Sequence, residues 1–245
     1  MKNFRYNFHK TINNKNTFSL SQEQYWILNE NSSFLCKESY NSLRTNIIFS
    51  IPKEGCKIIG ITSAERAEGK SINVLNLAIS LSEINKRVLL IDCDLRKPKI
   101  ARLLDLKSSP GITNVLVGLT GLNKTIQSTK YKNLDVLLSG DIPPNPTELI
   151  GSLKLTETLH ILSEQYDYIF IDTPPVNVVT DACILSNIIE GYIFLIRLNI
   201  SERNTVVNAI EKLKFVNAKI LGIIINNKHQ YKSLNKKQYN KYDIK

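Results

Sequence analysis

Hydrophobic residues fall into short runs that alternate with longer amphipathic segments along most of the chain. Six runs are rich in β-branched residues and apolar at successive positions, as in strands buried on both faces; they cover 57–62, 87–91, 134–138, 168–171, 192–197 and 219–225. Apolar residues spaced three and four apart predict helices over 36–50, 71–84, 147–165 and 203–215. This alternation predicts an α/β fold in which helices cover both faces of a doubly wound, mostly parallel sheet.

The two ends of the chain lack this pattern. Residues 1–35 are largely polar, and we expect them to form an N-terminal arm. Residues 228–245 contain six lysines and three tyrosines with almost no aliphatic side chain, which predicts a flexible basic tail. The folded domain should therefore extend over 36–227, and 42% hydrophobic residues are enough for one core of that size.

The formal net charge of +10 calls for a polyanionic partner. Nucleotide phosphates, acidic lipids, acidic proteins and nucleic acid all qualify, although no aromatic–basic motif or DNA-binding helix pair supports nucleic acid. The four cysteines form no CxxC pair and indicate reduced thiols rather than a zinc site or a disulfide framework. Because the N-terminus lacks the apolar segment of a signal peptide and no run approaches roughly 18 apolar residues, we expect a cytoplasmic protein.

The segment from Ile61 to Ser71 follows a predicted strand, opens a predicted helix and ends in Glu-Gly-Lys-Ser. In a phosphate-binding loop, backbone N–H groups and the positive end of the helix hold phosphate oxygens. Gly69 would let the backbone approach closely, Lys70 would reach the β- and γ-phosphates, and Ser71 would ligate Mg²⁺. The strict pattern has Gly where this chain has Ala64, so a chance match on a helix is the alternative. The chain has no GxGxxG motif, which disfavours a dinucleotide enzyme.

Aspartates follow two of the predicted strands. Asp92 and Asp94 end the run that begins at residue 88, and Asp172 ends the run that begins at residue 168. Parallel sheets place ligands at the carboxyl ends of their strands, where such carboxylates would face Mg²⁺ and phosphate. The alternative for each aspartate is a helix cap or a turn. Three aspartates beside a phosphate loop favour the metal–nucleotide interpretation.

These segments resemble the bacterial tyrosine kinase (BY-kinase) family when they are taken together with others in the same order. The matching segments are SLRTNIIFS (42–50), LLIDCDLRKP (89–98), GITNVLVG (111–118), DIPPNPTELIGS (141–152), FIDTPPV (170–176), VTDACIL (179–185) and GIIINN (222–227). Members are P-loop autokinases of capsule and exopolysaccharide synthesis, related to MinD/ParA-type ATPases. The resemblance implies a protein-tyrosine autokinase that uses ATP and Mg²⁺ and regulates polysaccharide synthesis and export.

The resemblance also implies roles for single residues. The nucleotide would be bound by Walker A positions and by an adenine-contacting asparagine: Glu68, Gly69, Lys70, Ser71, Ile72 and Asn226. For Asn226, a simple turn at a strand end is the alternative. The metal would be held by Ser71, Asp92 and Asp172. Catalysis would depend on Lys70, Asp92, Asp94 and Asp172, with Asp94 activating the attacking tyrosine hydroxyl.

Family members carry tail tyrosines that neighbouring subunits phosphorylate in trans, which implies Tyr231, Tyr239 and Tyr242 as phosphoacceptors. A solvated basic tail with incidental tyrosines is the alternative. The resemblance further implies a homo-oligomer and a membrane activator of the polysaccharide chain-length-regulator type. That activator would recruit the kinase to the inner face of the membrane, and a cognate tyrosine phosphatase would reverse the modification.

The oligomer motif of the family, Glu-x-x-Arg-x-x-Arg, here reads Glu38, Asn41 and Arg44. An ordinary surface pair between Glu38 and Arg44 is the alternative to a role in assembly. In the phosphate loop, Arg66 and Ala67 replace the Pro-Gly that is usual in the family.

Two other functions remain open at this stage. The first is a MinD/ParA-like nucleotide-switch ATPase, although Glu65 stands where those relatives carry a signature lysine. The second is a catalytically weak scaffold of an export complex, which the changes at Arg66, Ala67 and Asn41 would permit.

Overall fold

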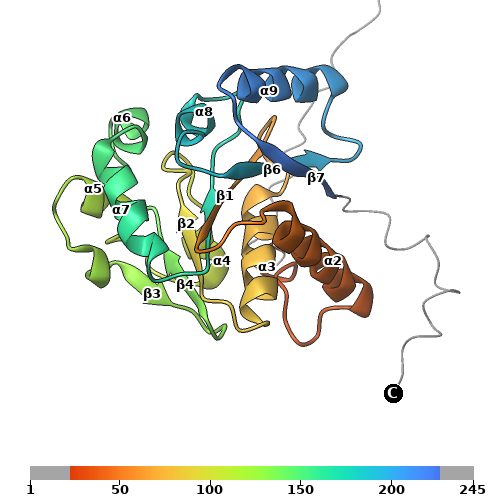
Figure 1. The fold of residues 1–245 in the computed structure, drawn as a ribbon, viewed down its shortest axis with the longest axis horizontal. Coiled ribbons are helices and arrows are strands. Elements are labelled where there is room, and N and C mark those ends of the chain that lie inside the picture. Colours follow the sequence, from red (N-terminus) through yellow and green to blue (C-terminus); the bar gives the residue numbers. More distant parts are fainter. Residues whose placement is uncertain (1–22, 227–245) are drawn as a thin grey trace, which may run out of the picture.

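The structure, a computed structural model, describes residues 23–226. Within them, one sheet is built from the strands β1 (Lys57–Ser63), β2 (Val88–Asp92), β3 (Ile126–Ser128), β4 (Leu134–Leu137), β5 (Tyr168–Asp172), β6 (Gly191–Arg197) and β7 (Ile220–Asn226). The strand order is β3-β4-β2-β5-β1-β6-β7 (Figure 1). Neighbouring strands run parallel except β3 and β4 at one edge. The predicted mostly parallel α/β fold is confirmed.

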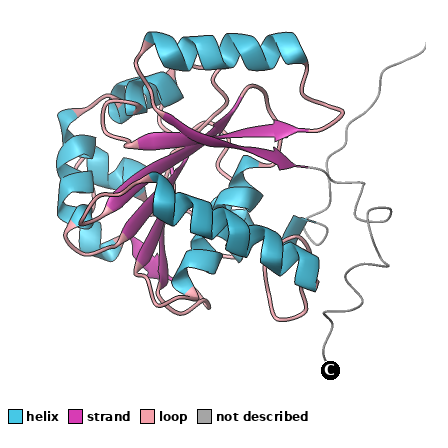
Figure 2. Cartoon of the chain, turned by 45° about the vertical axis from the view of Figure 1, so that its right-hand side comes forward, coloured by secondary structure: helices cyan, strands magenta, loops and turns pink. Residues whose placement is uncertain are grey.

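Helices cover both faces of this sheet (Figure 2). One face carries α2 (Phe34–Ser50), α3 (Lys70–Ser82) and α4 (Ile100–Leu104). The opposite face carries α5 (Ile112–Leu116), α6 (Pro146–Ile150), α7 (Leu153–Ser163), α8 (Asp181–Leu185) and α9 (Arg203–Phe215). Within residues 23–226, no helix combines the length and the apolar character needed to cross a bilayer.

The central strands are apolar over most of their length because each face packs against helices. In β5, Tyr168 and Phe170 lie in the core beneath α3, while Ile169 and Ile171 lie in the core beneath α7. All four are at least 97% buried. Successive side chains of a strand point to opposite faces, so a sheet covered on both sides requires such continuous apolar runs.

Two predicted boundaries differ from the structure. The single helix expected over 147–165 is two helices, α6 and α7, separated at Gly151. The break occurs because the Ser152 side chain accepts a hydrogen bond from the N–H of Leu155 and begins a new helix. Strand β3 is absent from the prediction, since three partly exposed residues at an edge carry too little alternation to be recognised.

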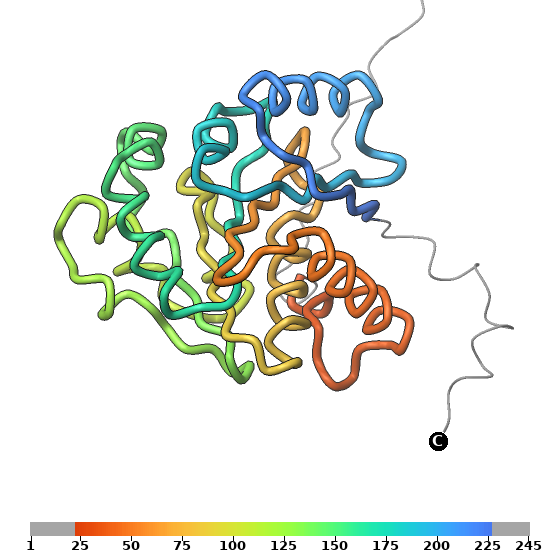
Figure 3. Tube along the Cα trace, viewed as in Figure 1, coloured from red at the N-terminus to blue at the C-terminus, as the bar shows by residue number. Residues whose placement is uncertain are grey.

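The packed domain also begins earlier than residue 36. Ile27 and Leu28 are buried in the core beside α3. The side chain of Asn76 on α3 clamps this segment: it donates to Trp26 O at 2.9 Å and accepts from Leu28 N at 2.8 Å. Residues 23–33 therefore run along α3 before α2 begins (Figure 3). They form a structured part of the domain because two apolar side chains anchor them, which corrects the predicted arm over 1–35 in this part.

Candidate active site

The loop between β1 and α3 has a backbone conformation that requires a glycine at position 69. Gly69 caps α3 with a φ of 103°, in the left-handed region that favours glycine. A Cβ at this position would lie 2.4 Å from Nδ2 of Asn226, so no larger residue fits without a shift. Position 69 therefore requires glycine because of its backbone conformation and the nearby Asn226, and the close approach to phosphate stays a prediction.

Three consecutive carbonyl groups of this loop accept hydrogen bonds from side chains of other elements. The donors are Arg197 to Ala67 O at 2.9 Å, Asn226 to Glu68 O at 2.9 Å, and Asn73 to Gly69 O at 2.9 Å. In the described part of the chain, the amide N–H groups of residues 66–69 have no acceptor. Free amides above a helix N-terminus suit an anion such as phosphate.

Two of the predicted nucleotide-binding residues, Glu68 and Asn226, make hydrogen bonds that hold the loop itself. The Glu68 carboxylate is fully buried and accepts from the Ser201 hydroxyl and from Glu65 N at 2.9 Å. Asn226 braces the loop instead of lining the cleft beside it. Sequence patterns overlooked Arg197 and Asn73, although Arg197 is a charged residue at the end of an apolar strand.

Ala67 has a φ of 61°, a conformation that costs an alanine about 1–2 kcal/mol. We expect Ala67→Gly to raise the free energy of unfolding by about 0.5–1 kcal/mol, because relief of this strain exceeds the added freedom of the unfolded chain. Urea unfolding measures the effect. As a matched control, Ala101→Gly within α4 should lose about 1 kcal/mol, because glycine disfavours helix. Equal losses in both variants would contradict a strained loop.

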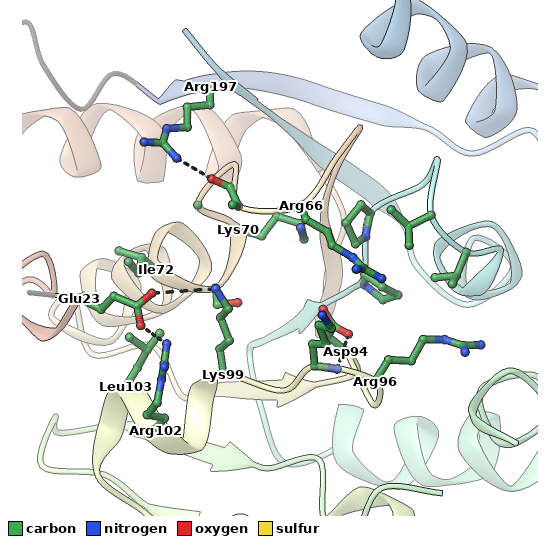
Figure 4. Close-up of a pocket in the computed structure, with 18 residues that line it drawn as sticks. Glu23, Arg66, Lys70, Ile72, Asp94, Arg96, Lys99, Arg102, Leu103 and Arg197 are labelled. Atoms are coloured by element: carbon green, nitrogen blue, oxygen red, sulfur yellow. Dashed lines mark hydrogen bonds and ion pairs between the residues drawn. The ribbon is translucent and has the colours of Figure 1, made fainter. Parts of the chain in front are cut away.

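A cleft of about 380 Å³ lies at the carboxyl ends of the strands, next to this loop. Its walls include the predicted residues Gly69, Lys70, Ser71, Ile72 and Asp94 (Figure 4). Seven Lys and Arg side chains line it against two acidic side chains, so the cleft suits a polyanion. The predicted phosphoacceptors Tyr231, Tyr239 and Tyr242 lie outside the described residues.

Asp92 and Asp172 lie side by side at the ends of β2 and β5. Both are fully buried, but their surroundings differ. Asp92 accepts three backbone N–H groups: Asp94 N at 3.2 Å, Lys99 N at 3.1 Å and Ile100 N at 3.1 Å. Within residues 23–226, neither carboxylate oxygen of Asp172 has a hydrogen-bond partner. Asp92 therefore lies at the predicted strand end, and its carboxylate also accepts the N–H groups at the start of α4, as in the alternative interpretation of a helix cap.

Burial raises the pKa of Asp172 to about 7, although the Lys70 ammonium acts in the opposite direction. Burial and the charge of Asp172 also raise the pKa of Asp92, against its backbone hydrogen bonds. When no cation is bound, each of these two buried carboxylates therefore holds a proton more readily than a solvated aspartate does.

A buried carboxylate without a hydrogen-bond partner needs a physical explanation, and a bound ion is one of them. The Ser71 hydroxyl lies beside Asp172. A hydroxyl and a carboxylate at a phosphate site are the protein ligands that Mg²⁺ uses together with nucleotide oxygens and water. The residues present therefore fit a magnesium ion bound through the nucleotide. Among the described residues there is no group of three or more His, Cys, Asp or Glu that could hold a metal ion.

Lys70 supplies a buried positive charge beside these carboxylates. Only 7% of the residue is exposed, and Nζ donates to Ser63 Oγ at 3.0 Å. Burial lowers the pKa of Lys70, while the nearby Asp172 and Asp94 oppose that effect. A phosphate group in the cleft would give this ammonium further acceptors and a counter-charge.

A further buried carboxylate, that of Asp181, positions one of the cleft cations. Asp181 is fully buried and accepts from Arg96 Nε at 3.2 Å and from Thr147 Oγ1 at 2.8 Å. Arg96 also donates to Thr147 Oγ1 at 2.7 Å. Asp181 therefore supports Arg96 and Thr147, while Thr180 is the residue that caps α8. The role of Thr147 could not be seen in the sequence, because its partners come from distant elements.

Comparison with known proteins decides the family. Residues 56–189 match the AAA domain family. The tyrosine-protein kinase YwqD of Bacillus subtilis is 39% identical over 214 residues, which make up 87% of this chain and 90% of YwqD. The chain belongs to the bacterial tyrosine-protein kinase family. The resemblance predicted from its motifs is thereby confirmed.

Solved structures place the kinase in the same group. It matches the chimerical protein CapA2B2 with a TM-score of 0.76 and 33% identity, over 81% of this chain and 86% of that chain. MinD of Pyrococcus horikoshii, solved with Mg-ADP, matches with a TM-score of 0.60 and 27% identity over 70% of each chain. The kinase thus shares its P-loop fold with nucleotide-binding ATPases of the MinD type.

Proposed function

We propose that the protein is an ATP-dependent protein-tyrosine autokinase that phosphorylates Tyr231, Tyr239 and Tyr242 of neighbouring copies. The observation that carries the proposal is one basic cleft with a phosphate loop on one wall, Asp94 on the other and the unpaired Asp172 below. Membership of the tyrosine kinase family supports phosphoryl transfer to tyrosine as the reaction.

The loop amides and Lys70 would bind the β- and γ-phosphates, since loop residues and Lys70 line the cleft and the amide N–H groups of residues 66–69 have no acceptor among the described residues. Ser71 and Asp172 would hold Mg²⁺. When bound, that ion neutralises charge on the phosphate oxygens during transfer. Arg197 and Asn226 would keep the loop carbonyls turned away from the phosphates.

Asp94 would accept a proton in this cleft. It lines the wall opposite the loop, and its Oδ1 accepts from Lys97 N at 3.1 Å, which fixes the carboxylate (Figure 4). As the tyrosine oxygen forms its bond to the γ-phosphorus, the bond to the β–γ bridging oxygen breaks and ADP leaves. Asp94 takes the hydroxyl proton. Asp92 would position the strand end and add charge near the site without contacting the metal directly.

We further propose that the kinase acts as a homo-oligomer on capsular or exopolysaccharide synthesis, at the inner face of the membrane. A membrane activator of the chain-length-regulator type would recruit it, and a tyrosine phosphatase would reverse its modification; nucleic acid is not a partner. In α2, Asn41 donates to Glu38 at 2.8 Å, while Arg44 donates to Ser80 O at 2.6 Å. Glu38 and Arg44 thus have other partners and do not form the surface ion pair that was the alternative to a role in assembly. Glu38 remains exposed for a neighbouring subunit.

A trans-phosphorylation experiment tests the proposal. The enzyme is the variant in which the three tail tyrosines are phenylalanine, and the acceptor is the full-length Lys70→Met variant. Incubated together with Mg-ATP, the mixture should yield phosphotyrosine on the acceptor tail, detected by mass spectrometry. Neither protein alone should be modified. If the acceptor stays unmodified while the parent protein, incubated by itself with Mg-ATP, labels its own tail, the transfer occurs within one chain. Unmodified tails in both would refute the kinase and leave a switch ATPase or a scaffold.

A further inference from the structure

The cleft holds a pair of cations that the proposed reaction does not use. Lys99 precedes α4 and Arg102 lies within it. Between them sits the carboxylate of Glu23, which forms an ion pair with Arg102 and lies 4.0 Å from Lys99 Nζ (Figure 4). All three side chains line the same cleft as the phosphate loop.

Glu23 is held in this position by the fold around it. The segment that carries it is anchored four residues later by Ile27 in the core. Gln24 Nε2 donates to the carbonyl groups of Arg102 and Leu103 at 3.5 Å each, which ties the segment to α4. The Glu23 side chain is 14% exposed, whereas Lys99 and Arg102 are 44% and 47% exposed. The acid is thus covered while its two partners open to the cleft.

The pair lies close to the place where phosphates would bind. Ile72, in the first turn of α3, and Leu103 line the wall around it. The charge of Lys99 is near enough to add to the lowering of the Lys70 pKa by burial and to oppose the rise of the Asp172 pKa. A lysine and an arginine side by side, already holding a carboxylate, have the chemistry of a phosphoryl-binding site.

We propose that Lys99 and Arg102 form a phosphoryl-binding subsite, and that Glu23 is an internal carboxylate that fills it until a phosphoryl group displaces it. The phosphoryl group has two sources, the terminal phosphate of the nucleotide and the phosphotyrosine of a modified tail. Either source makes Glu23 an internal competitor, because one carboxylate and one phosphoryl group cannot occupy the same pair. This inference rests on the proposed function of the cleft.

Calorimetric titration of full-length Glu23→Gln tests the proposal. The ligands are a non-hydrolysable ATP analogue, ADP and a phosphotyrosine amide, at fixed ionic strength. The substitution should tighten binding of one ligand class by roughly twofold to fivefold, the range expected for losing one partly exposed ion-pair competitor. Adding Lys99→Gln or Arg102→Gln to this variant should remove the gain. The matched control is Glu157→Gln on α7, which loses the same charge from an exposed pair with Lys154; its binding should equal that of the parent.

The pattern of ligands identifies the source. A gain for the ATP analogue but not for ADP assigns the subsite to the terminal phosphate. A gain for phosphotyrosine assigns it to the modified tail. Equal affinities of Glu23→Gln and the parent for all three ligands, or an equal gain in the control, would overturn the proposal. If the parent binds no nucleotide, the proposed kinase function fails, and the phosphotyrosine titration still decides the subsite.

Discussion

The Asp172→Asn variant should be more stable than the parent protein and inactive as a kinase. Asp172 is fully buried and, within residues 23–226, neither of its oxygens accepts a hydrogen bond. A charge in that position destabilises the metal-free fold, and a neutral amide removes the cost. Without Mg²⁺ and nucleotide, we expect the free energy of unfolding at pH 8 to rise by on the order of 2 kcal/mol. Kinase activity should fall at least about 100-fold, because the metal loses its protein carboxylate.

The gain in stability should depend on pH in a defined direction. The folded-state pKa of Asp172 is raised from 3.8 to about 7, so the folded protein binds the extra proton between these values. The parent protein therefore loses stability as the pH rises from about 4 to about 7, and the advantage of the asparagine grows over that range. Above about pH 7 the advantage is constant. Thermal unfolding across this range measures it.

Asp92→Asn is the matched control on the neighbouring strand. The Asp92 carboxylate accepts three backbone N–H groups. An amide offers a single acceptor oxygen, so this variant should lose about 1–3 kcal/mol. The same substitution at two paired strand ends is thus expected to change the free energy of unfolding in opposite directions. If Asp172→Asn were less stable than the parent, the carboxylate of Asp172 would have a structural partner, and its assignment to the metal would be wrong.

Replacing Lys70 by methionine should abolish kinase activity while the fold is retained. The methionine side chain has a similar length and fills the same buried position, but it removes the charge and the donor to Ser63. Loss of one such electrostatic contact to the transferred group reduces phosphoryl transfer by at least about 100-fold. The free energy of unfolding should stay level or rise, because the ammonium is desolvated, as its lowered pKa indicates.

Lys107→Met is the control for this prediction. Lys107 is exposed and lies outside the cleft. This variant should keep the activity of the parent, measured as phosphotyrosine formed per minute. An active Lys70→Met variant would show that the phosphate loop is not the catalytic site.

Much of the fold could be predicted because its signals are local. The strands of the sheet centre are largely apolar runs, and a short loop after β1 leads to Gly69, which caps α3, and to Lys70 and Ser71, which begin it. The adjacency of Asp92 and Asp172 follows from their position at the ends of two parallel strands, although their register had to come from the structure. Strand β3 escaped prediction because its pairing partner, rather than its own sequence, makes it a strand.

The contacts that shape the site were beyond the sequence because they join distant segments. Glu23 meets Arg102 across 79 positions, and Arg197 meets Ala67 across 130. Neither pair belongs to a motif, and each side chain alone looks like an ordinary surface charge. The different roles of Asp92 and Asp172 also depend on which carboxylate receives the N–H groups that precede and begin α4, which only the folded backbone decides.

The most direct test of the kinase assignment is the fate of the γ-phosphate of ATP. Purified full-length protein is incubated with Mg-ATP labelled at that phosphate, and phosphotyrosine and free phosphate are counted together. We predict label on Tyr231, Tyr239 and Tyr242, and no label in the Lys70→Met and Asp94→Asn variants. ATP consumed with label appearing only as free phosphate would contradict this account and identify a nucleotide-switch ATPase.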